Sequence, residues 1–206
     1  MQNQIPVSVY AEMTPNPATL KFVANKLIVN GDFMAEYMHR AEVNGTAPLA
    51  DKLFEFPFVK SLFFAGNFVA VTKTDDIGWD YITMELREFV QDFMRNNEWA
   101  VVKEPVPLKK ENEENTDTIS GGLDHTQPKG DIEFQIIALL DEYVKPAVER
   151  DGGAILFRAY DNGIVKLAMK GACAGCPSSK MTLKSGIETL LKQHIAEVQE
   201  VEAEDL

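Results

Sequence analysis

The sequence predicts an α+β fold of two small α/β-sandwich-type domains, each a small sheet packed by helices, joined by a flexible acidic linker. Segments whose apolar residues alternate, as in strands, are interleaved with segments whose apolar residues recur every three or four positions, as in helices. Hairpin turns separate the strand-like segments, at Gly66-Asn67 in the first half and at Asp161-Asn162-Gly163 in the second. Between the halves lies a stretch rich in proline, glycine and acidic residues and poor in apolar ones.

These boundaries predict a first domain at 1–103, a flexible linker at 104–130 and a second domain at 131–206. The chain has 206 residues, 45% of them apolar and 25% charged, which is ordinary for globular protein. A linker of this length and composition behaves as a coil, so we expect the two domains to move independently of each other.

The first domain begins with a turn signal, Thr14-Pro15-Asn16-Pro17, followed by alternating strand-like and helix-like segments. The expected strands are Thr19–Val23, Lys26–Val29, Val59–Ala65 and Asn67–Lys73. The expected helices are Phe33–Val43, Ala47–Phe54 with Pro48 near its start, and the long amphipathic Trp79–Asn96. This domain holds neither a cysteine nor a clustered set of catalytic side chains, so we expect it to bind partners.

The second domain predicts a helix, a hairpin and a second helix. Asp131 is a suitable cap for the first helix, Pro146 should bend it, and Asp151-Gly152-Gly153 should end it. The expected elements after this are the strands Ala154–Tyr160 and Ile164–Lys170, the helix Pro177–His194, and a short last strand near Val198 and Val201. The second strand leads the chain directly into the only two cysteines of the sequence.

Those cysteines, Cys173 and Cys176, lie in the segment Gly171-Ala172-Cys173-Ala174-Gly175-Cys176-Pro177-Ser178-Ser179. Pro177 suits the first position of a helix, where a missing N–H costs nothing. Thiols just before it face the positive end of the helix dipole, which favours thiolates. Gly171 and Gly175 allow positive φ and a close approach of the backbone to whatever the sulfurs hold. The loop therefore presents two thiolates in one direction.

Two thiolates at this spacing suit a redox disulfide, half of a zinc site or half of an iron–sulfur site, and unreactive thiols are the plain alternative. Zinc sites and cubane clusters usually take four ligands. His39, His125 and His194 are scattered and show no spacing that would complete a site within one chain. If a metal centre forms, a symmetric dimer in which each chain gives Cys173 and Cys176 is the economical solution.

Charge and segment composition limit the partners and the location. The net charge of −12, from 20 basic and 32 acidic residues, gives no electrostatic attraction to nucleic acid or to an anionic membrane. No apolar run approaches the ~20 residues of a transmembrane helix. The first basic residue is Lys21, so no charged leader is evident, and two cysteines are too few for a disulfide scaffold. These features predict a cytoplasmic protein that binds neither nucleic acid nor membrane.

The second domain closely resembles the NifU C-terminal domain of the Nfu family of iron–sulfur scaffold and carrier proteins. The resemblance covers about Asp131 to Val201 and depends on the order of helix, Asp-Gly-Gly, hairpin, paired-cysteine loop and helix. The first domain resembles the Nfu amino-terminal domain. The segments that carry this second resemblance are Thr14-Pro15-Asn16-Pro17-Ala18-Thr19-Leu20-Lys21-Phe22, Ala47-Pro48-Leu49-Ala50, and Leu62-Phe63-Phe64 through Val69-Ala70-Val71-Thr72-Lys73.

The resemblance implies a carrier rather than an enzyme. It implies a 4Fe–4S cluster bound between two subunits, with Cys173 and Cys176 as ligands, and its transfer to apo-proteins. It also implies that the amino-terminal domain assists recognition of cluster donors and targets. Mitochondrial members begin with a targeting peptide, and none is evident in this sequence, so the resemblance implies a bacterial-type cytoplasmic protein.

Two other functions use the same cysteines. A thiol–disulfide oxidoreductase of the thioredoxin kind has its pair in a βαβ unit, whereas here a hairpin precedes the loop and Pro177 follows the second cysteine directly. This difference ranks the oxidoreductase below the carrier. A zinc-bridged structural dimer would use the same four thiolates, so the sequence leaves it open.

Overall fold

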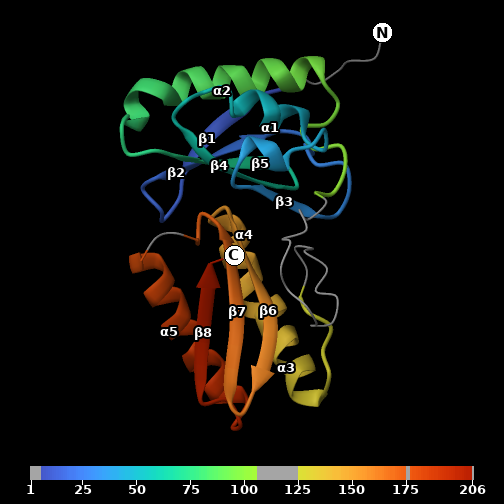
Figure 1. The fold of residues 1–206 in the computed structure, drawn as a ribbon, viewed down its shortest axis with the longest axis vertical. Helices are drawn as coiled ribbons and strands as arrows, with labels where there is room; N and C mark the ends of the chain where they lie inside the picture. Colours follow the sequence, from blue (N-terminus) through green and yellow to red (C-terminus); the bar gives the residue numbers. More distant parts are fainter. Residues whose placement is uncertain (1–5, 106–124, 175–176, 206) are drawn as a thin grey trace. The chain divides into compact units, whose positions relative to one another are not determined.

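The computed structural model describes residues 6–105, 125–174 and 177–205, and gives the backbone alone for 177–180 and 205. The chain divides into two compact units, unit 1 (Met1–Glu114) and unit 2 (Asn115–Leu206). Each unit contains one β-sheet packed by helices (Figure 1), so the predicted α+β class is confirmed. Most of the predicted linker 104–130 lies outside the described residues.

Unit 1 contains a five-stranded antiparallel sheet in the order β1-β2-β5-β4-β3. Its strands are β1 (Val9–Met13), β2 (Thr19–Ala24), β3 (Met34–Tyr37), β4 (Val59–Ala65) and β5 (Phe68–Lys73). Its helices are the 3₁₀ turn η1 (Arg40–Glu42), α1 (Pro48–Leu53) and α2 (Trp79–Asn96). The strands β4 and β5, α1, and α2 agree with the predicted segments to within one residue at each end.

Periodicity explains the core of unit 1. Along β2 the alternate residues Leu20, Phe22 and Ala24 belong to one hydrophobic cluster, as the two-residue period of a strand requires. The residues of α2 in that cluster recur every four positions: Ile82, Leu86, Val90 and Met94. Residues of α1 belong to the same cluster, so both helices cover one face of the sheet, as Figure 1 shows.

Two predicted elements of unit 1 are wrong. The segment Phe33–Val43 was expected to be a helix, but it forms β3 and then η1. β3 pairs with β4 at the edge of the sheet and buries Ala35 and Tyr37, on one face of the strand, completely. The apolar residues around β3 fit a helical period as well as a strand, and pairing with a distant strand decides between them.

The predicted strand Lys26–Val29 does not form either. Its backbone is hydrogen-bonded to two separate parts of the chain rather than to one neighbouring strand. The N–H groups of Ile28 and Val29 both donate to the carbonyl of Gly66, at 2.8 and 3.2 Å, in the β4–β5 turn. The carbonyl of Ile28 accepts from Ala100, at 2.7 Å, beyond α2. Only an isolated bridge between Val29 and Val101 remains of the expected pairing in this segment.

Unit 2 contains a three-stranded sheet in the order β6-β7-β8, with helices on one of its faces. Its elements are α3 (Asp131–Leu139), the π-helical turn η2 (Leu140–Val144), α4 (Lys145–Arg150), β6 (Gly153–Asp161), β7 (Ile164–Gly171), α5 (Pro177–His194) and β8 (Glu200–Asp205). The helix α5 agrees with its predicted bounds. Asp131 is the first residue of α3 rather than its cap, because Gly130 occupies the cap position.

The predicted bend before Pro146 takes the form of η2. Proline has no N–H, so the carbonyl of Glu142, four residues earlier, loses its usual helical donor. At this place the N–H of Lys145 donates to the carbonyl of Leu140, five residues back, and the helix widens by one residue. Asp151 and Gly152 then end α4, with Gly152 at a left-handed φ of 83° as the sequence predicts.

The last strand makes a connection that the sequence did not predict. β6 and β7 form an antiparallel hairpin, whereas β8 pairs with β7 in parallel. Parallel neighbours need a crossover, and α5 supplies it. The segment between β7 and α5, which contains the cysteines, therefore lies at the carboxyl end of the central strand of the sheet.

A histidine holds the end of the predicted linker against unit 2. The N–H of Phe157 in β6 donates to His125 Nδ1 at 2.7 Å, and the next residue, Thr126, donates its N–H to the carbonyl of Phe157 at 2.9 Å. His125 Nε2 lies 3.1 Å from Asp141 Oδ1. Because Nδ1 accepts, the ring proton is assigned to Nε2, where Asp141 accepts it. Residues 125 and 126 thus cover part of the outer edge of β6.

Replacing His125 by alanine should loosen this edge. The substitution leaves the Phe157 N–H without its acceptor, at a cost of roughly 1 kcal/mol or more. We expect hydrogen exchange of the Phe157 amide, measured by NMR, to accelerate about fivefold or more. His125→Asn is the matched control, because its Oδ1 can accept in place of Nδ1. Equal exchange in all three proteins would contradict the role of the ring nitrogen.

Glu188 joins α5 to β8. Its Oε1 lies 2.5 Å from Lys192 Nζ, and its Oε2 accepts the N–H of Val201 at 3.2 Å. These hydrogen bonds, that from Lys192 first, hold the pKa of Glu188 below its ordinary value of 4.5. A carboxyl whose pKa is lower in the folded state stabilises it above the unfolded-state pKa and loses this contribution as pH falls through the folded-state pKa.

Glu188→Gln should therefore remove part of the acid sensitivity of unit 2. We expect the unfolding midpoint of the unaltered chain to fall more steeply below about pH 4.5 than that of the variant, followed by circular dichroism. Glu204→Gln, at an exposed position of β8, controls for the loss of one negative charge. Parallel curves for Glu188→Gln and the unaltered chain would show that the contacts of Glu188 carry no pH-dependent stability.

Candidate metal centre

The paired-cysteine loop begins where β7 ends and finishes where α5 begins. The backbone N–H groups in the first turn of α5 have no carbonyl of an earlier helical turn to donate to. This end of the helix therefore attracts negative charge. The loop lies between this helix end and the β6–β7 hairpin, whose open end is formed by Gly153 and Gly171. The loop thus connects the carboxyl end of a strand to the positive end of a helix.

Cys173 is the cysteine that the structure describes. Its side chain is buried, with 8% exposed, and packs in the hydrophobic cluster of unit 2 together with residues such as Ile155, Met169 and Ile187. Cys176 and Gly175 lie outside the described residues. The predicted pairing of Cys173 with Cys176 as ligands therefore stays a prediction.

Backbone hydrogen bonds fasten the first half of the loop. Gly171 has a left-handed φ of 64°, as predicted for it, and its carbonyl accepts the N–H of Ala174 at 3.1 Å. Ala172 donates its N–H to the carbonyl of Gly152 at 3.1 Å. Gly152 and Gly153 were predicted only to end the preceding helix. The sequence signal for a further role is the second glycine, because one glycine is enough to end a helix.

The three histidines lie in separate parts of the chain. His39 precedes η1 in unit 1, His125 is bonded to Phe157 and Asp141, and the ring of His194 stacks on Tyr143 with centroids 6.3 Å apart. Among the described residues no three or more histidine, cysteine, aspartate or glutamate side chains lie close enough to share a metal ion. Within the described part of the chain, the role of Cys173 as a metal ligand therefore stays a prediction.

One ground for ranking the oxidoreductase lower is removed by the structure. That ranking relied on the absence of a βαβ unit around the cysteines. A hairpin does precede the loop, but β7, α5 and β8 also form a parallel βαβ crossover with the loop between its first two elements. The position of Pro177 directly after Cys176 is the remaining sequence difference from a thioredoxin-like pair.

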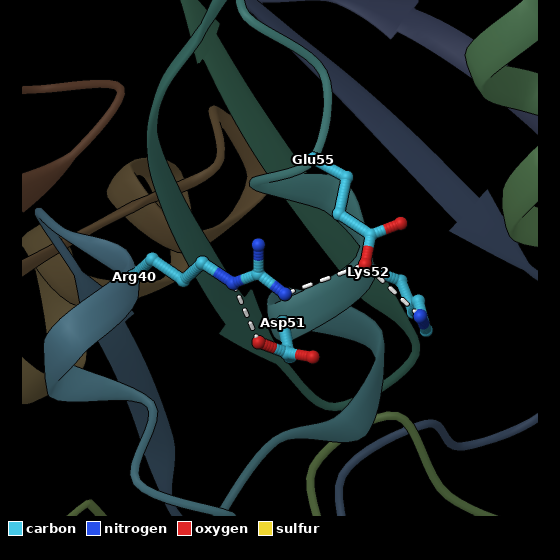
Figure 2. A network of polar contacts seen from close by, with 4 residues as sticks. All are labelled: Arg40, Asp51, Lys52 and Glu55. Carbon is cyan, nitrogen blue, oxygen red and sulfur yellow. Dashed lines mark hydrogen bonds and ion pairs between the residues drawn. The ribbon is translucent and has the colours of Figure 1, made fainter.

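Unit 1 has a hollow of about 650 Å³ between η1 and α1, lined by small residues together with Arg40 and Asp51. Figure 2 shows the ion pairs beside this hollow. Arg40 Nε lies 2.7 Å from Asp51 Oδ1, and Arg40 Nη2 lies 3.3 Å from Glu55 Oε1. Lys52 Nζ lies 3.0 Å from the same Glu55 oxygen. The hydrogen bond from Arg40 lowers the pKa of Asp51. These paired charges balance one another, so the hollow carries no excess charge that would select a ligand.

Comparison with protein families gives a match for each half of the chain. Residues 9–97 match the family described as scaffold protein Nfu/NifU N terminal, and residues 136–202 match the NifU-like domain. The second match includes the whole paired-cysteine loop. The two together extend over most of the described residues.

Two relatives align with nearly the whole chain. "NifU-like protein 4, mitochondrial" of Arabidopsis thaliana is 34% identical over 201 residues, which cover 95% of this chain and 65% of the relative. "NFU1 iron-sulfur cluster scaffold homolog, mitochondrial" of Drosophila erecta is 31% identical over 208 residues, covering 98% of this chain and 69% of the relative. The chain thus spans less than two thirds of the length of the Arabidopsis protein.

A solved structure is similar to part of the chain. The solution NMR structure of a NifU-like protein from Saccharomyces cerevisiae has a TM-score of 0.44 and 23% sequence identity. The match covers 50% of this chain and 92% of the yeast protein.

The prediction of a cytoplasmic location is wrong, because the relatives of this chain are named as mitochondrial proteins. The prediction relied on the residues at the start of the sequence. A sequence that spans part of its relatives' length gives no information about a leader, so those residues do not indicate a compartment. As to membranes, none of the helices within the described residues combines the length and apolar character needed to cross one.

Proposed function

Because the chain belongs to the Nfu family of iron–sulfur cluster scaffold proteins, we propose that it assembles and carries a 4Fe–4S cluster as cargo. In this proposal two copies of the chain hold one cluster, and each copy supplies Cys173 and Cys176. The cluster passes from this dimer to apo-proteins that have their own cysteine ligands. The protein acts by binding and release and is not an enzyme.

The observation that carries the proposal is the position of the cysteine loop within the match to the NifU-like domain. The geometry around Cys173 supports it. The hydrogen bond from the Ala172 N–H to the carbonyl of Gly152 fixes the loop to the residue before β6, and the loop leads into the positive end of α5. The helix end favours an anionic cargo with thiolate ligands, and the hydrogen bond orders the backbone next to Cys173.

Division of the site between two chains follows from the number of ligands. A cubane cluster takes four thiolates, and the sequence holds two cysteines. Within the described residues no further cluster of ligating side chains lies near Cys173. A second copy supplies the missing pair through a symmetric arrangement, in which the same surface of each chain faces the other.

Transfer in this proposal is an exchange of ligands without a change of redox state. An incoming target thiolate forms a bond to iron as the bond from Cys173 or Cys176 breaks, and the released thiolate takes up the proton that the target thiol gave up. A cluster at the joint between two chains is accessible to such an exchange when the chains separate. A cage within one chain would need that chain to open.

The two domains divide the work in the same proposal. The second domain, 131–206, holds the cargo, and the first domain, 1–103, recognises donors and targets, with 104–130 as the linker between them. Unit 1 has its own hydrophobic core and Cys173 lies in unit 2, so the proposal assigns recognition and cargo binding to different units.

Anaerobic reconstitution with iron and sulfide tests the proposal directly. We expect a broad absorption near 400 nm, about four irons for every two chains, and the native mass of a dimer. Cys173→Ser or Cys176→Ser should abolish stable assembly, because each removes two of the four thiolates in the dimer. His194→Ala is the control and should load fully.

Three outcomes would contradict the proposal. An iron-loaded form with the mass of one chain would rule out the shared site. Uptake of zinc and no uptake of iron in the absence of oxygen would favour the colourless zinc-bridged dimer. Reduction of insulin disulfides with turnover by the unloaded protein would favour the oxidoreductase.

Deletion of Met1–Lys103 separates the proposed roles of the two units. The cluster should assemble as in the full chain, because its ligands and the core around Cys173 lie in unit 2. Delivery to selected apo-proteins, measured by the rate at which they gain activity, should slow. Unchanged delivery to every target tested would show that unit 1 has no part in recognition.

A further inference from the structure

The start of β6 and the cysteine loop touch without any side chain between them. Gly153, the first residue of β6, lies opposite Gly171, the last residue of β7, at the open end of the hairpin. The loop that follows Gly171 turns back over this end, where Ala172 is bonded to the carbonyl of Gly152. Cys173 therefore comes to lie directly against Gly153.

Space, and not backbone conformation, requires glycine at position 153. The φ of Gly153 lies outside the left-handed region, so other residues could adopt it. A Cβ placed on Gly153 would lie 2.8 Å from Cys173 Sγ, 2.7 Å from the carbonyl oxygen of Lys170 and 3.1 Å from the N of Cys173. Two of these three atoms are backbone, so rotation of a side chain would not relieve the crowding.

We propose that Gly153 is a positioning residue for the iron–sulfur site, since the space left by its missing side chain is the seat of the Cys173 thiol. This inference rests on the proposed function for the role of Cys173, but the seat itself is a property of the protein without cargo. The seat holds Cys173 buried, at 8% exposure, within the hydrophobic cluster of unit 2. The ligand is thus in place before iron arrives, and less ordering is needed when the cluster binds.

Gly153→Ala should lift the loop from β6 and expose the thiol. The measurement is the rate at which iodoacetamide alkylates Cys173 in the reduced, cargo-free full chain at one fixed pH, followed by peptide mass spectrometry. We expect the rate to rise about tenfold or more, because thiol reactivity depends on access. Gly186→Ala in α5 is the matched control, since a Cβ there meets no atom within 4 Å, and its rate should equal that of the unaltered chain.

A folded Gly153→Ala protein whose Cys173 reacts at the unaltered rate would overturn the proposal. Folding is judged from the dispersed amide NMR spectrum of unit 2. If the variant does not fold, the unaltered protein decides the question by itself. Nuclear Overhauser effects between the Hα protons of Gly153 and the Hβ protons of Cys173 are expected, and their absence would overturn the proposal.

Anaerobic loading distinguishes failure of the seat from failure of the proposed function. If the unaltered chain binds a cluster, Gly153→Ala should lose iron to a chelator several-fold faster than Gly186→Ala. If the unaltered chain binds no iron but its Cys173 is protected from alkylation, the proposed function is refuted while the role of Gly153 in positioning Cys173 still stands. If the Gly153→Ala variant binds iron normally and its Cys173 is alkylated at the unaltered rate, the role of Gly153 is refuted while the proposed function still stands.

Discussion

The pairing of β7 on both of its edges is the constraint on which unit 2 depends. β6 reaches one edge through a tight hairpin, but β8 can pair in parallel on the other edge only after the chain has returned through α5. The return must begin at the carboxyl end of β7, so a loop between a strand end and a helix start is unavoidable there. The cysteines occupy this loop, and α5 directs its positive end toward it.

The parts of the fold that could be predicted are those with a strong local pattern. The helices Trp79–Asn96 and Pro177–His194 have apolar residues at helical spacing over many turns, and the two central hairpins have turn residues that suit few other structures. Phe33–Val43 and Lys26–Val29 were assigned wrongly because distant partners decide their structure. Met34–Tyr37 needs β4, and Ile28 needs Gly66 and Ala100, and no local pattern contains that information.

In the candidate site, too, local sequence patterns predict some features, and contacts between distant residues decide the others. The spacing of Cys173 and Cys176 and the proline after them are local signals, and they predict a pair of thiolate ligands from the sequence alone. That pairing stays a prediction. The reason for Gly153 is a contact with a residue twenty positions later, across a hairpin, and the sequence shows only a second glycine after a helix end. His125 was hidden for a similar reason: its surroundings have the composition of a linker, yet its ring accepts the N–H of a buried residue of β6.

A carrier must hold its cargo and also release it, and these demands conflict if one element serves both. The seat on Gly153 favours holding: it fixes a thiol against backbone atoms that cannot rotate away, so little conformational entropy is lost when the cluster binds. Release in the proposed dimer depends on a different element, the joint between the two copies. When the copies separate, Gly153 keeps Cys173 of each copy in place while the cluster loses half of its ligands at once. A fixed Cys173 in each copy is therefore compatible with a labile cargo, because the weak step lies between the chains.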